Sequence, residues 1–253
     1  MSGSPGRYLE AIEDRIRDFR AYLALARSWF SQNPGFSNLC RLIRWYFRWN
    51  RYQRRSRMLI DAAEPWLAFS CSDFLRKQIR QGWKVFEYGS GGSSLFFALH
   101  GAAGVSVEHD TGWAQKVQEK LREAGAKWQV LIVPSEAGLL DSRGCEDPSG
   151  YRSSFPGFED RNFKKYAETI DSFPKASFDL VIVDGRARPS CLLHGAAKVR
   201  PGGFLILDDS QRERYQAVIK ILGPEWKRTD FTGPKPQCPD WPQTTLWQYT
   251  KEA

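Results

Sequence analysis

The sequence predicts an α/β fold, with a doubly wound, mostly parallel sheet of seven strands and an N-terminal helical extension. Two observations lead to this prediction. From residue 84 onward, brief apolar runs that end in polar or Gly residues alternate with helical stretches, which is typical of a parallel sheet covered on both faces. Before residue 60, apolar residues instead recur every three or four positions, as in amphipathic helices. The predicted division is a helical extension (1–60) and a sheet domain (61–253).

The strands are expected where the chain is briefly and continuously apolar. The first five are Lys84–Tyr88, Gly104–Glu108, Gln129–Val133, Asp179–Val183 and Gly203–Leu207. The helices that fit between them are Ser94–His100, Thr111–Ala124, Phe163–Ile170 and Ser190–Val199. The last two strands, an antiparallel edge pair, are Trp226–Phe231 and Thr244–Tyr249.

The extension is predicted to form two helices separated by a break at residues 31–36. The seam of the first helix consists of Leu9, Ile12, Ile16, Phe19, Leu23, Ala26 and Phe30. The second helix runs from about Leu39 to about Arg57. One of its stripes holds Arg41, Arg44, Arg48, Arg51 and Arg55, and the other side holds Leu39, Leu42, Ile43, Tyr46, Trp49 and Tyr52.

The net charge of +8 is concentrated in this second helix. Residues 41–57 carry seven Arg and no acidic residue, whereas residues 81–253 hold 22 basic and 22 acidic side chains. Three interpretations stay open. The aromatic side packs against the protein and the arginines are solvated, or the helix lies on an anionic membrane surface, or, as the less favoured option, it binds nucleic-acid phosphates.

The composition excludes several classes of protein. No run of about 18 apolar residues exists to span a membrane, and the first 30 residues lack the apolar core of a secretory signal. The five cysteines are scattered without a CxxC pair, which favours reduced thiols over disulfides or a zinc site. We therefore expect a cytoplasmic protein, peripheral to the inner face of the membrane if residues 41–57 bind lipid.

The most informative segment is residues 85–98, where an apolar strand runs into a Gly-rich turn and directly into a helix. Glycines let the backbone approach a ligand, and the start of a helix presents unpaired N–H groups. A dinucleotide site would need GxGxxG, but the segment Gly89–Ser94 ends in Ser. Glu87 would repel a pyrophosphate, and it suits a cationic amino-acid moiety.

This segment resembles motif I of the class I S-adenosylmethionine-dependent methyltransferases, (E/D)xGxGxG, with Ser93 in place of the last glycine. The resemblance continues in order over residues 84–250, through VEHD, VDGRAR and PGGFLILDDS. The EYGSGGSS form is similar to a bacterial group of methyltransferases with a poorly defined substrate. The resemblance implies a Rossmann-like methyltransferase domain at 61–253, S-adenosylmethionine as cofactor, and an enzyme.

The implied cofactor site lies at the carboxyl ends of the first strands, where ligands bind in open α/β sheets. A carboxylate at Glu108, which ends the second strand, can accept both ribose hydroxyls. The predicted cofactor-binding residues are Glu87, Tyr88, Gly89, Ser90, Gly91, Ser94, Glu108, His109 and Asp184. Each strand-end acid, taken alone, could instead be an ordinary polar terminus of a buried strand.

Asp184 and Asp209 are the predicted catalytic residues, because strand-end carboxylates are expected near the transferred methyl group. One of them could act as general base on a hydroxyl. The alternative, with Asp208 as a third ligand, is a divalent metal site, which we disfavour because catechol-type O-methyltransferases have Asn where Asp209 stands. No metal ligand is predicted, and Asp209 could also cap the next helix.

Other residues near this edge could contact the substrate. Arg186 and Arg188 follow the fourth strand and could bind a carboxylate or phosphate, or simply be solvated. His194 suits a structural role better than a catalytic one. The long, aromatic-rich segment 137–178 is a candidate substrate lid or a packed surface excursion.

The absence of two known motifs argues against two kinds of methyl acceptor. Neither the Asn/Asp-Pro-Pro-Tyr loop of amino-group methylation nor the Pro-Cys pair of cytosine C5 methylation occurs. We expect O-methylation of a hydroxyl on a small-molecule, saccharide or lipid-linked acceptor. The alternatives are an RNA methyltransferase that uses residues 41–57, and a cofactor-binding assembly protein without turnover.

Overall fold

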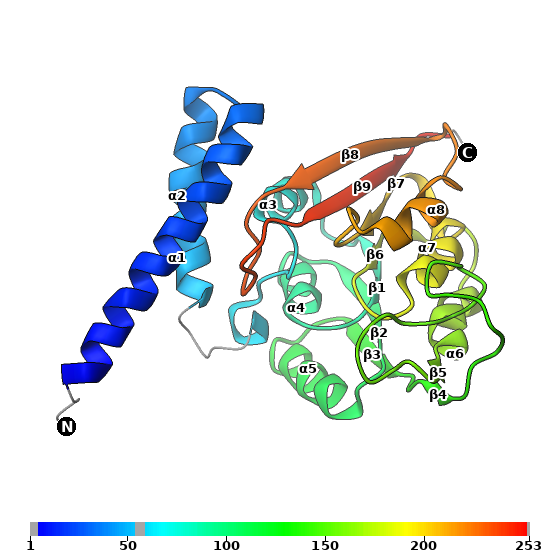
Figure 1. Ribbon diagram of the computed structural model, residues 1–253. Helices are drawn as coiled ribbons and strands as arrows, with labels where there is room; N and C mark the ends of the chain where they lie inside the picture. Colours follow the sequence, from blue (N-terminus) through cyan, green and yellow to red (C-terminus); the bar gives the residue numbers. More distant parts are fainter. Residues whose placement is uncertain (1–4, 54–58, 252–253) are drawn as a thin grey trace.

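The structure, a computed structural model, describes residues 5–53 and 59–251. A two-helix hairpin stands against one side of a sheet domain (Figure 1). The hairpin contains α1 (Pro5–Gln32) and α2 (Phe36–Gln53). The helices of the sheet domain are α3 (Phe69–Gln78), α4 (Gly92–Leu99), α5 (Thr111–Glu123), α6 (Lys164–Glu168), α7 (Arg188–Ala196) and α8 (Gln216–Ile219), with 3-10 turns η1 (Leu59–Ala62), η2 (Thr169–Ser172) and η3 (Glu213–Tyr215).

Seven strands form one sheet in the order β3-β2-β1-β6-β7-β9-β8. These strands are β1 (Lys84–Tyr88), β2 (Ala103–Glu108), β3 (Trp128–Ile132), β6 (Phe178–Val183), β7 (Val199–Leu207), β8 (Trp226–Thr232) and β9 (Gln243–Tyr249). The first five are parallel, and β9 runs antiparallel to both β7 and β8. The predicted mostly parallel sheet with an antiparallel edge pair is thereby confirmed.

Two local features differ from the prediction. Strand β7 begins at Val199, four residues early, because Val199 pairs with Phe178 before a register shift restores regular pairing at Phe204. The long segment 137–178 is anchored by a small ribbon of β4 (Glu136–Ala137) and β5 (Arg161–Asn162), which was not predicted. The ribbon ties the two ends of residues 138–160 together, so this segment forms a closed excursion at the carboxyl edge of the sheet.

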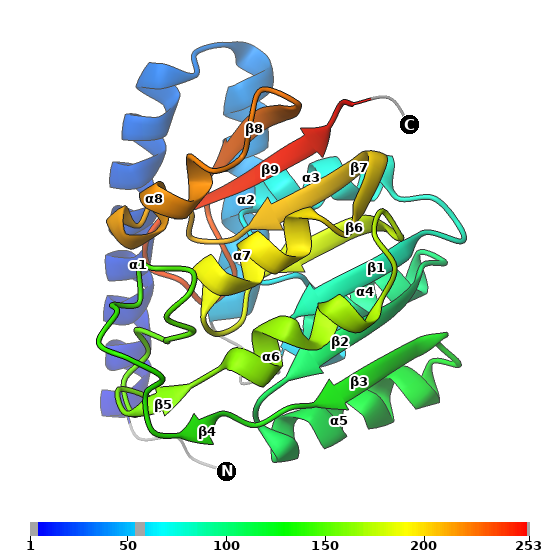
Figure 2. The same cartoon turned by 90° about the vertical axis from the view of Figure 1, so that its right-hand side faces the viewer.

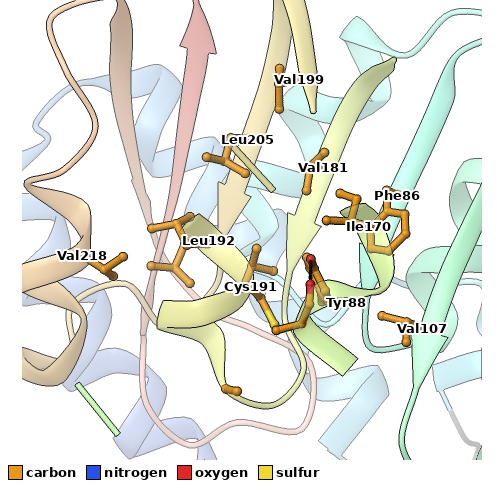
Figure 3. Packing of buried hydrophobic residues seen from close by; sticks show 14 of the residues in the cluster. Phe86, Tyr88, Val107, Ile170, Val181, Cys191, Leu192, Val199, Leu205 and Val218 are labelled. Carbon is orange, nitrogen blue, oxygen red and sulfur yellow. Dashed lines mark hydrogen bonds between the residues drawn. The ribbon is translucent and has the colours of Figure 1, made fainter. Parts of the chain in front are cut away.

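Helices cover both faces of the sheet, as its uninterrupted apolar strands require. Figure 2 shows α6 and α7 in front of the sheet and α4 and α5 behind it. In the front layer, Phe86 and Val181 pack against Ile170 and Leu192 (Figure 3). Because the chain leaves β1 toward β2 on one side and enters β6 on the other, a ligand crevice is expected where the ends of β1 and β6 meet.

The hairpin is fastened to the sheet domain by polar contacts of its aromatic residues. Trp29 Nε1 donates to Thr232 Oγ1 at 3.1 Å, and Trp49 Nε1 donates to the Cys238 carbonyl oxygen at 3.0 Å. Trp45, which is fully buried, lies against Gly233, where a Cβ would approach the indole ring to 3.2 Å. On the predicted aromatic side of the second helix, Leu42, Trp49 and Tyr52 are buried against the protein, whereas Leu39 and Ile43 are exposed.

Two details of the predicted hairpin are corrected. The seam of α1 is buried only toward its C-terminal end, at Ala26 and in part at Phe30, because Ile12, Ile16, Phe19 and Leu23 are 36–46% exposed. Arg48 is not solvated with the other arginines, because it turns inward and pairs with Glu64 and Asp73. The sequence pattern could not separate these faces, because α2 is rich in apolar residues on more than one side. The side chain of Leu9 and residues 54–57, including Arg55 and Arg57, lie outside the described part.

In the described part of the chain, no helix is both long and apolar enough to cross a membrane.

Candidate active site

A cavity of about 1180 Å³ lies at the carboxyl ends of β1, β2, β6 and β7. Its β1–β2 half is lined by residues 89–93 and 108–110 together with Glu87 and Trp113. Its β6–β7 half is lined by residues that include Asp184, Gly185, Arg186, Arg188, Asp209, Arg212, Arg214, Tyr215 and Lys235. Aromatic residues of the segment 152–158 also line the cavity, so the predicted lid reaches the site.

The Gly-rich loop after β1 approaches the loop after β6 so closely that only glycine fits. Gly89 has a φ of +94°, a conformation that side-chain-bearing residues rarely adopt. A Cβ on Gly185 would lie 2.1 Å from the Tyr166 hydroxyl and 3.0 Å from the Gly89 nitrogen. These glycines bring the two strand ends together and leave the cavity open above them.

Glu87 is buried under this loop and is held by three serine hydroxyls. Ser94 Oγ donates to it at 2.5 Å and Ser106 Oγ at 2.9 Å, and Ser93 Oγ makes a third hydrogen bond. Burial raises the pKa of Glu87 to about 7, although the three hydroxyl donors lower it in part. Glu87 lines the cavity. Because its pKa is about 7, the charge of Glu87 depends on pH near neutrality.

Two residues of the predicted cofactor set have side chains that lie away from the cavity. The Tyr88 side chain points away from the cavity, and its hydroxyl donates to the Ala167 carbonyl oxygen at 2.6 Å. Ser94 is fully buried and bridges Glu87 to the Gly91 nitrogen. Neither side chain lines the cavity, because alternate residues of a strand point to opposite faces and Ser94 lies inside the first turn of α4.

Glu108 ends β2 and accepts hydrogen bonds from several groups around it. One carboxylate oxygen accepts from the Ser90 nitrogen at 3.1 Å, and the other accepts from the backbone nitrogens of His109 and Asp110. Burial opposes its ionisation, but the His109 side chain and these backbone donors outweigh burial and hold the pKa of Glu108 below its ordinary value. The β1–β2 half of the cavity thus contains an ionised carboxylate.

The ring of His109 is placed between this carboxylate and the lid segment. His109 Nδ1 lies 2.6 Å from Glu108 Oε1, and the ring centroid is 5.3 Å from that of Phe158. Trp113 closes the other side, where its Nε1 donates to the Ser90 carbonyl oxygen at 2.7 Å. The predicted residues Gly89, Ser90, Gly91, Glu108 and His109 are therefore brought together along one wall.

Three carboxylates at the ends of β6 and β7 form ion pairs with two buried cations. Arg188 Nη2 lies 2.9 Å from Asp184 Oδ1, and its Nη1 lies 3.4 Å from Asp209 Oδ2. Lys235, from the loop between β8 and β9, pairs with Asp208 and with Asp209. Burial would favour a neutral lysine, but these acids raise the pKa of Lys235 above its ordinary value.

The two predicted catalytic acids differ in their electrostatic surroundings. Burial, followed by the charge of Asp208, raises the pKa of Asp184 well above its ordinary value. Burial also acts on Asp209, but Lys235, Arg188 and Arg212 outweigh it and lower the pKa of that group. A carboxylate with a raised pKa is the better proton acceptor, so this geometry favours Asp184 over Asp209.

Cationic side chains occupy the carboxylates of this half of the cavity. Within residues 5–53 and 59–251, no group of three His, Cys, Asp or Glu side chains is arranged to hold a metal ion. Oxygens that a cation such as Mg²⁺ would need are already bound by Arg188 and Lys235. Asp208 itself is fully buried behind Lys235 and Thr244 Oγ1.

His194 lies outside the cavity, in a structural contact. Its Nδ1 is 2.6 Å from Asp171 Oδ2, and its Nε2 is 3.2 Å from the Tyr151 hydroxyl. This pairing joins α7 to the lid segment.

Lys235 is the functional residue that the sequence pattern did not reveal. It stands in a Gly- and Pro-rich loop with no periodic pattern, far in sequence from the acids that it neutralises. The only available signal was the cluster of strand-end acids itself, because several buried carboxylates require cations nearby.

No protein-family model matches the chain, and no curated protein gives a significant match. Solved structures do match. A protein described as a "putative O-methyltransferase" from Klebsiella pneumoniae is 19% identical over 78% of this chain and 92% of its own, with a TM-score of 0.53. A methyltransferase-like protein from Silicibacter pomeroyi is 22% identical, covering 75% and 89%, with a TM-score of 0.50. Cofactor-bound Rv0187 from MTB is 16% identical, covering 77% and 87%, with a TM-score of 0.51.

These likenesses, together with the strand order, show that the chain has the Rossmann-like fold of the class I methyltransferases.

The buried Glu87 predicts a specific pH dependence of stability. The folded state binds the Glu87 proton more tightly than the unfolded state, so stability is lost as pH rises from the unfolded pKa of 4.5 to the folded pKa of about 7. Between about pH 5 and about pH 8, the unfolding free energy of the ligand-free wild type should fall by roughly 2 kcal/mol more than that of Glu87→Gln. Urea denaturation at both pH values measures it. Glu119→Gln, on the exposed side of α5, is the control, and equal declines in the Glu87 variant and wild type would contradict the assignment.

Proposed function

We propose that this protein is an S-adenosylmethionine-dependent methyltransferase that methylates a hydroxyl group of a small-molecule, saccharide or lipid-linked acceptor. The fold supports this proposal. One matched structure is cofactor-bound, and another is described as a "putative O-methyltransferase". The observation that carries the proposal is that one cavity has two distinct halves. The β1–β2 half holds the acidic Glu87 and Glu108, which suit a cationic methyl donor, and the β6–β7 half holds Asp184, which would accept a proton.

The β1–β2 half would hold the cofactor. The glycine loop lets the donor approach the backbone, and Glu108, ionised at the end of β2, is placed to accept ribose hydroxyls. Glu87 beneath the loop attracts positive charge without a direct contact, because its oxygens are engaged by serines. When bound, the cofactor supplies a methyl group from its sulfonium centre.

In the β6–β7 half, Asp184 would act as the general base. As the methyl–sulfur bond of the sulfonium breaks and a neutral thioether is left, the acceptor oxygen would take the methyl group and its hydroxyl proton would pass to an Asp184 carboxylate oxygen. Arg188 holds that carboxylate at 2.9 Å and thereby orients it. Asp209, tied to Arg188, Arg212 and Lys235, suits the task of positioning these cations better than proton abstraction.

The Glu108 assignment is testable by cofactor binding. Glu108→Gln keeps the shape of the side chain but removes its charge, so affinity for S-adenosylhomocysteine should fall about 10- to 100-fold. Calorimetric titration measures the dissociation constant. Glu119→Gln should bind like wild type, and an unchanged constant in the Glu108 variant would place Glu108 outside the site.

The Asp184 assignment is testable by turnover. Asp184→Asn should leave the thermal transition and S-adenosylhomocysteine affinity close to wild type, whereas methyl transfer should fall about 100-fold or more because the general base is lost. Acceptors come from a cell extract, with transfer of labelled methyl as the readout. The activity of wild type should rise with pH as Asp184 loses its proton, and the variant should lack this rise. Full activity in Asp184→Asn would refute the assignment.

We also propose that the hairpin binds an anionic membrane surface, near a lipid-linked acceptor. Its exposed apolar residues are Ile12, Ile16, Phe19, Leu23, Phe36, Leu39, Ile43 and Phe47. The two helices join in one surface, because the Phe19 ring meets Tyr46 and Tyr46 meets Phe47. Exposed arginines such as Arg44 and Arg51 accompany this surface. A lipid interface accommodates both kinds of side chain, whereas RNA would leave aliphatic residues such as Ile12, Ile16 and Ile43 exposed to water.

Vesicle binding tests the hairpin proposal. Wild type should co-sediment with vesicles of phosphatidylglycerol and phosphatidylcholine, and less with phosphatidylcholine alone. Ile43→Ser with Phe47→Ser should weaken binding about tenfold, because buried apolar area is lost. Leu99→Ser, at an exposed position of the sheet domain, is the control. Unchanged sedimentation of the double variant would contradict the proposal. So would light scattering that shows a dimeric wild type and a monomeric double variant, or an RNA gel shift without vesicle binding.

A further inference from the structure

The charges in the β6–β7 half of the cavity divide into a balanced set and a remainder. The balanced set consists of Asp184, Asp208 and Asp209 with Arg188, Arg212 and Lys235, all joined by ion pairs. Two further arginines, Arg186 and Arg214, line the same half. Neither forms an ion pair with any described residue, so this part of the cavity carries excess positive charge.

Arg186 is held in place by the lid segment but lacks polar partners. Its guanidinium carbon lies 3.8 Å from the ring centroid of Phe155 and 5.5 Å from that of Phe158. Its Nε is buried without a hydrogen-bond partner among the described residues. Burial lowers the pKa of Arg186 from its ordinary value, although an arginine stays protonated at neutral pH. A charged donor left without an acceptor is costly, and a ligand oxygen would remove this cost.

Arg214 repeats this arrangement on the neighbouring loop. Its guanidinium carbon lies 5.6 Å from the ring centroid of Tyr215, and its Nε is also buried without a partner. Arg186 follows β6 and Arg214 follows β7, and these strands are paired up to Val183 and Leu207. Both arginines therefore lie at the same edge of the sheet and line the same cavity.

We propose that Arg186 and Arg214 form a subsite for an oxyanion of the methyl acceptor, a carboxylate or a phosphate. The inference rests on the proposed function, because it takes the β6–β7 half of the cavity as the acceptor site. A guanidinium fork matches two oxygens of either group, and its aromatic support fixes the plane of the fork. Of the two arginines expected from the sequence, Arg188 is excluded from this role because the three carboxylates engage it. The methyl acceptor thus carries its hydroxyl close to an acidic group.

The test uses the full chain saturated with S-adenosylhomocysteine, titrated with phenyl phosphate, with benzoate, and with phenol as a neutral control. Wild type should bind at least one of the two anions more tightly than phenol, and the better anion distinguishes a phosphate from a carboxylate site. Arg186→Gln and Arg214→Gln should each weaken that binding about tenfold or more, with S-adenosylhomocysteine affinity unchanged within about twofold. Arg186→Lys, which keeps the charge but loses the fork, should be intermediate. Arg80→Gln, remote from the cavity, should bind like wild type.

The outcomes separate this inference from the proposed function. If S-adenosylhomocysteine binds but both anions bind no better than phenol, or if the glutamine variants bind like wild type, the subsite is refuted and the methyltransferase proposal stands. The titration is repeated without S-adenosylhomocysteine. If that compound does not bind at all, the proposed function fails, while anion binding that depends on Arg186 and Arg214 would still support the subsite. Circular dichroism melts confirm that the variants are folded.

Discussion

The pairing of three carboxylates at the ends of β6 and β7 with buried cations is the interaction on which the site depends. An unpaired charge in a protein interior is destabilising by several kcal/mol, so Asp184, Asp208 and Asp209 could not be held together without cations. Arg188 and Lys235 supply them from two different loops. The pairing holds Asp184 at the cavity surface, and the fully buried Asp208 pairs with the same two cations.

A second constraint acts at the other half of the cavity, where negative charge is also concentrated. Glu87 and Glu108 lie under and beside the glycine loop, and each is surrounded by hydroxyl or backbone donors. These donors allow the acids to stay buried and fixed in position. Their opposite effects on pKa, raised at Glu87 and lowered at Glu108, follow from how strongly burial is offset at each group.

Much of the fold followed from local sequence pattern, because buried parallel strands are short, apolar and bounded by polar residues. Strand β1 has the predicted bounds, and the Gly-rich turn after it was found where the resemblance placed it. Side-chain direction was harder to predict. Tyr88 and Ser94 belong to the motif but face away from the cavity, and much of the apolar seam of α1 is exposed, because a pattern reveals which residues share a face and not what covers that face. Lys235 was not predicted, because its partners are defined only by tertiary structure.

The hydrogen bond from Trp49 to the Cys238 carbonyl oxygen has a consequence for communication across the molecule. Cys238 belongs to the same loop as Lys235, and both residues line the cavity. A tilt of α2 would thus move this loop and shift the Lys235 ammonium group, which pairs with Asp208. A ligand bound to the outer side of the hairpin would in this way change the position of Lys235 without contacting the cavity.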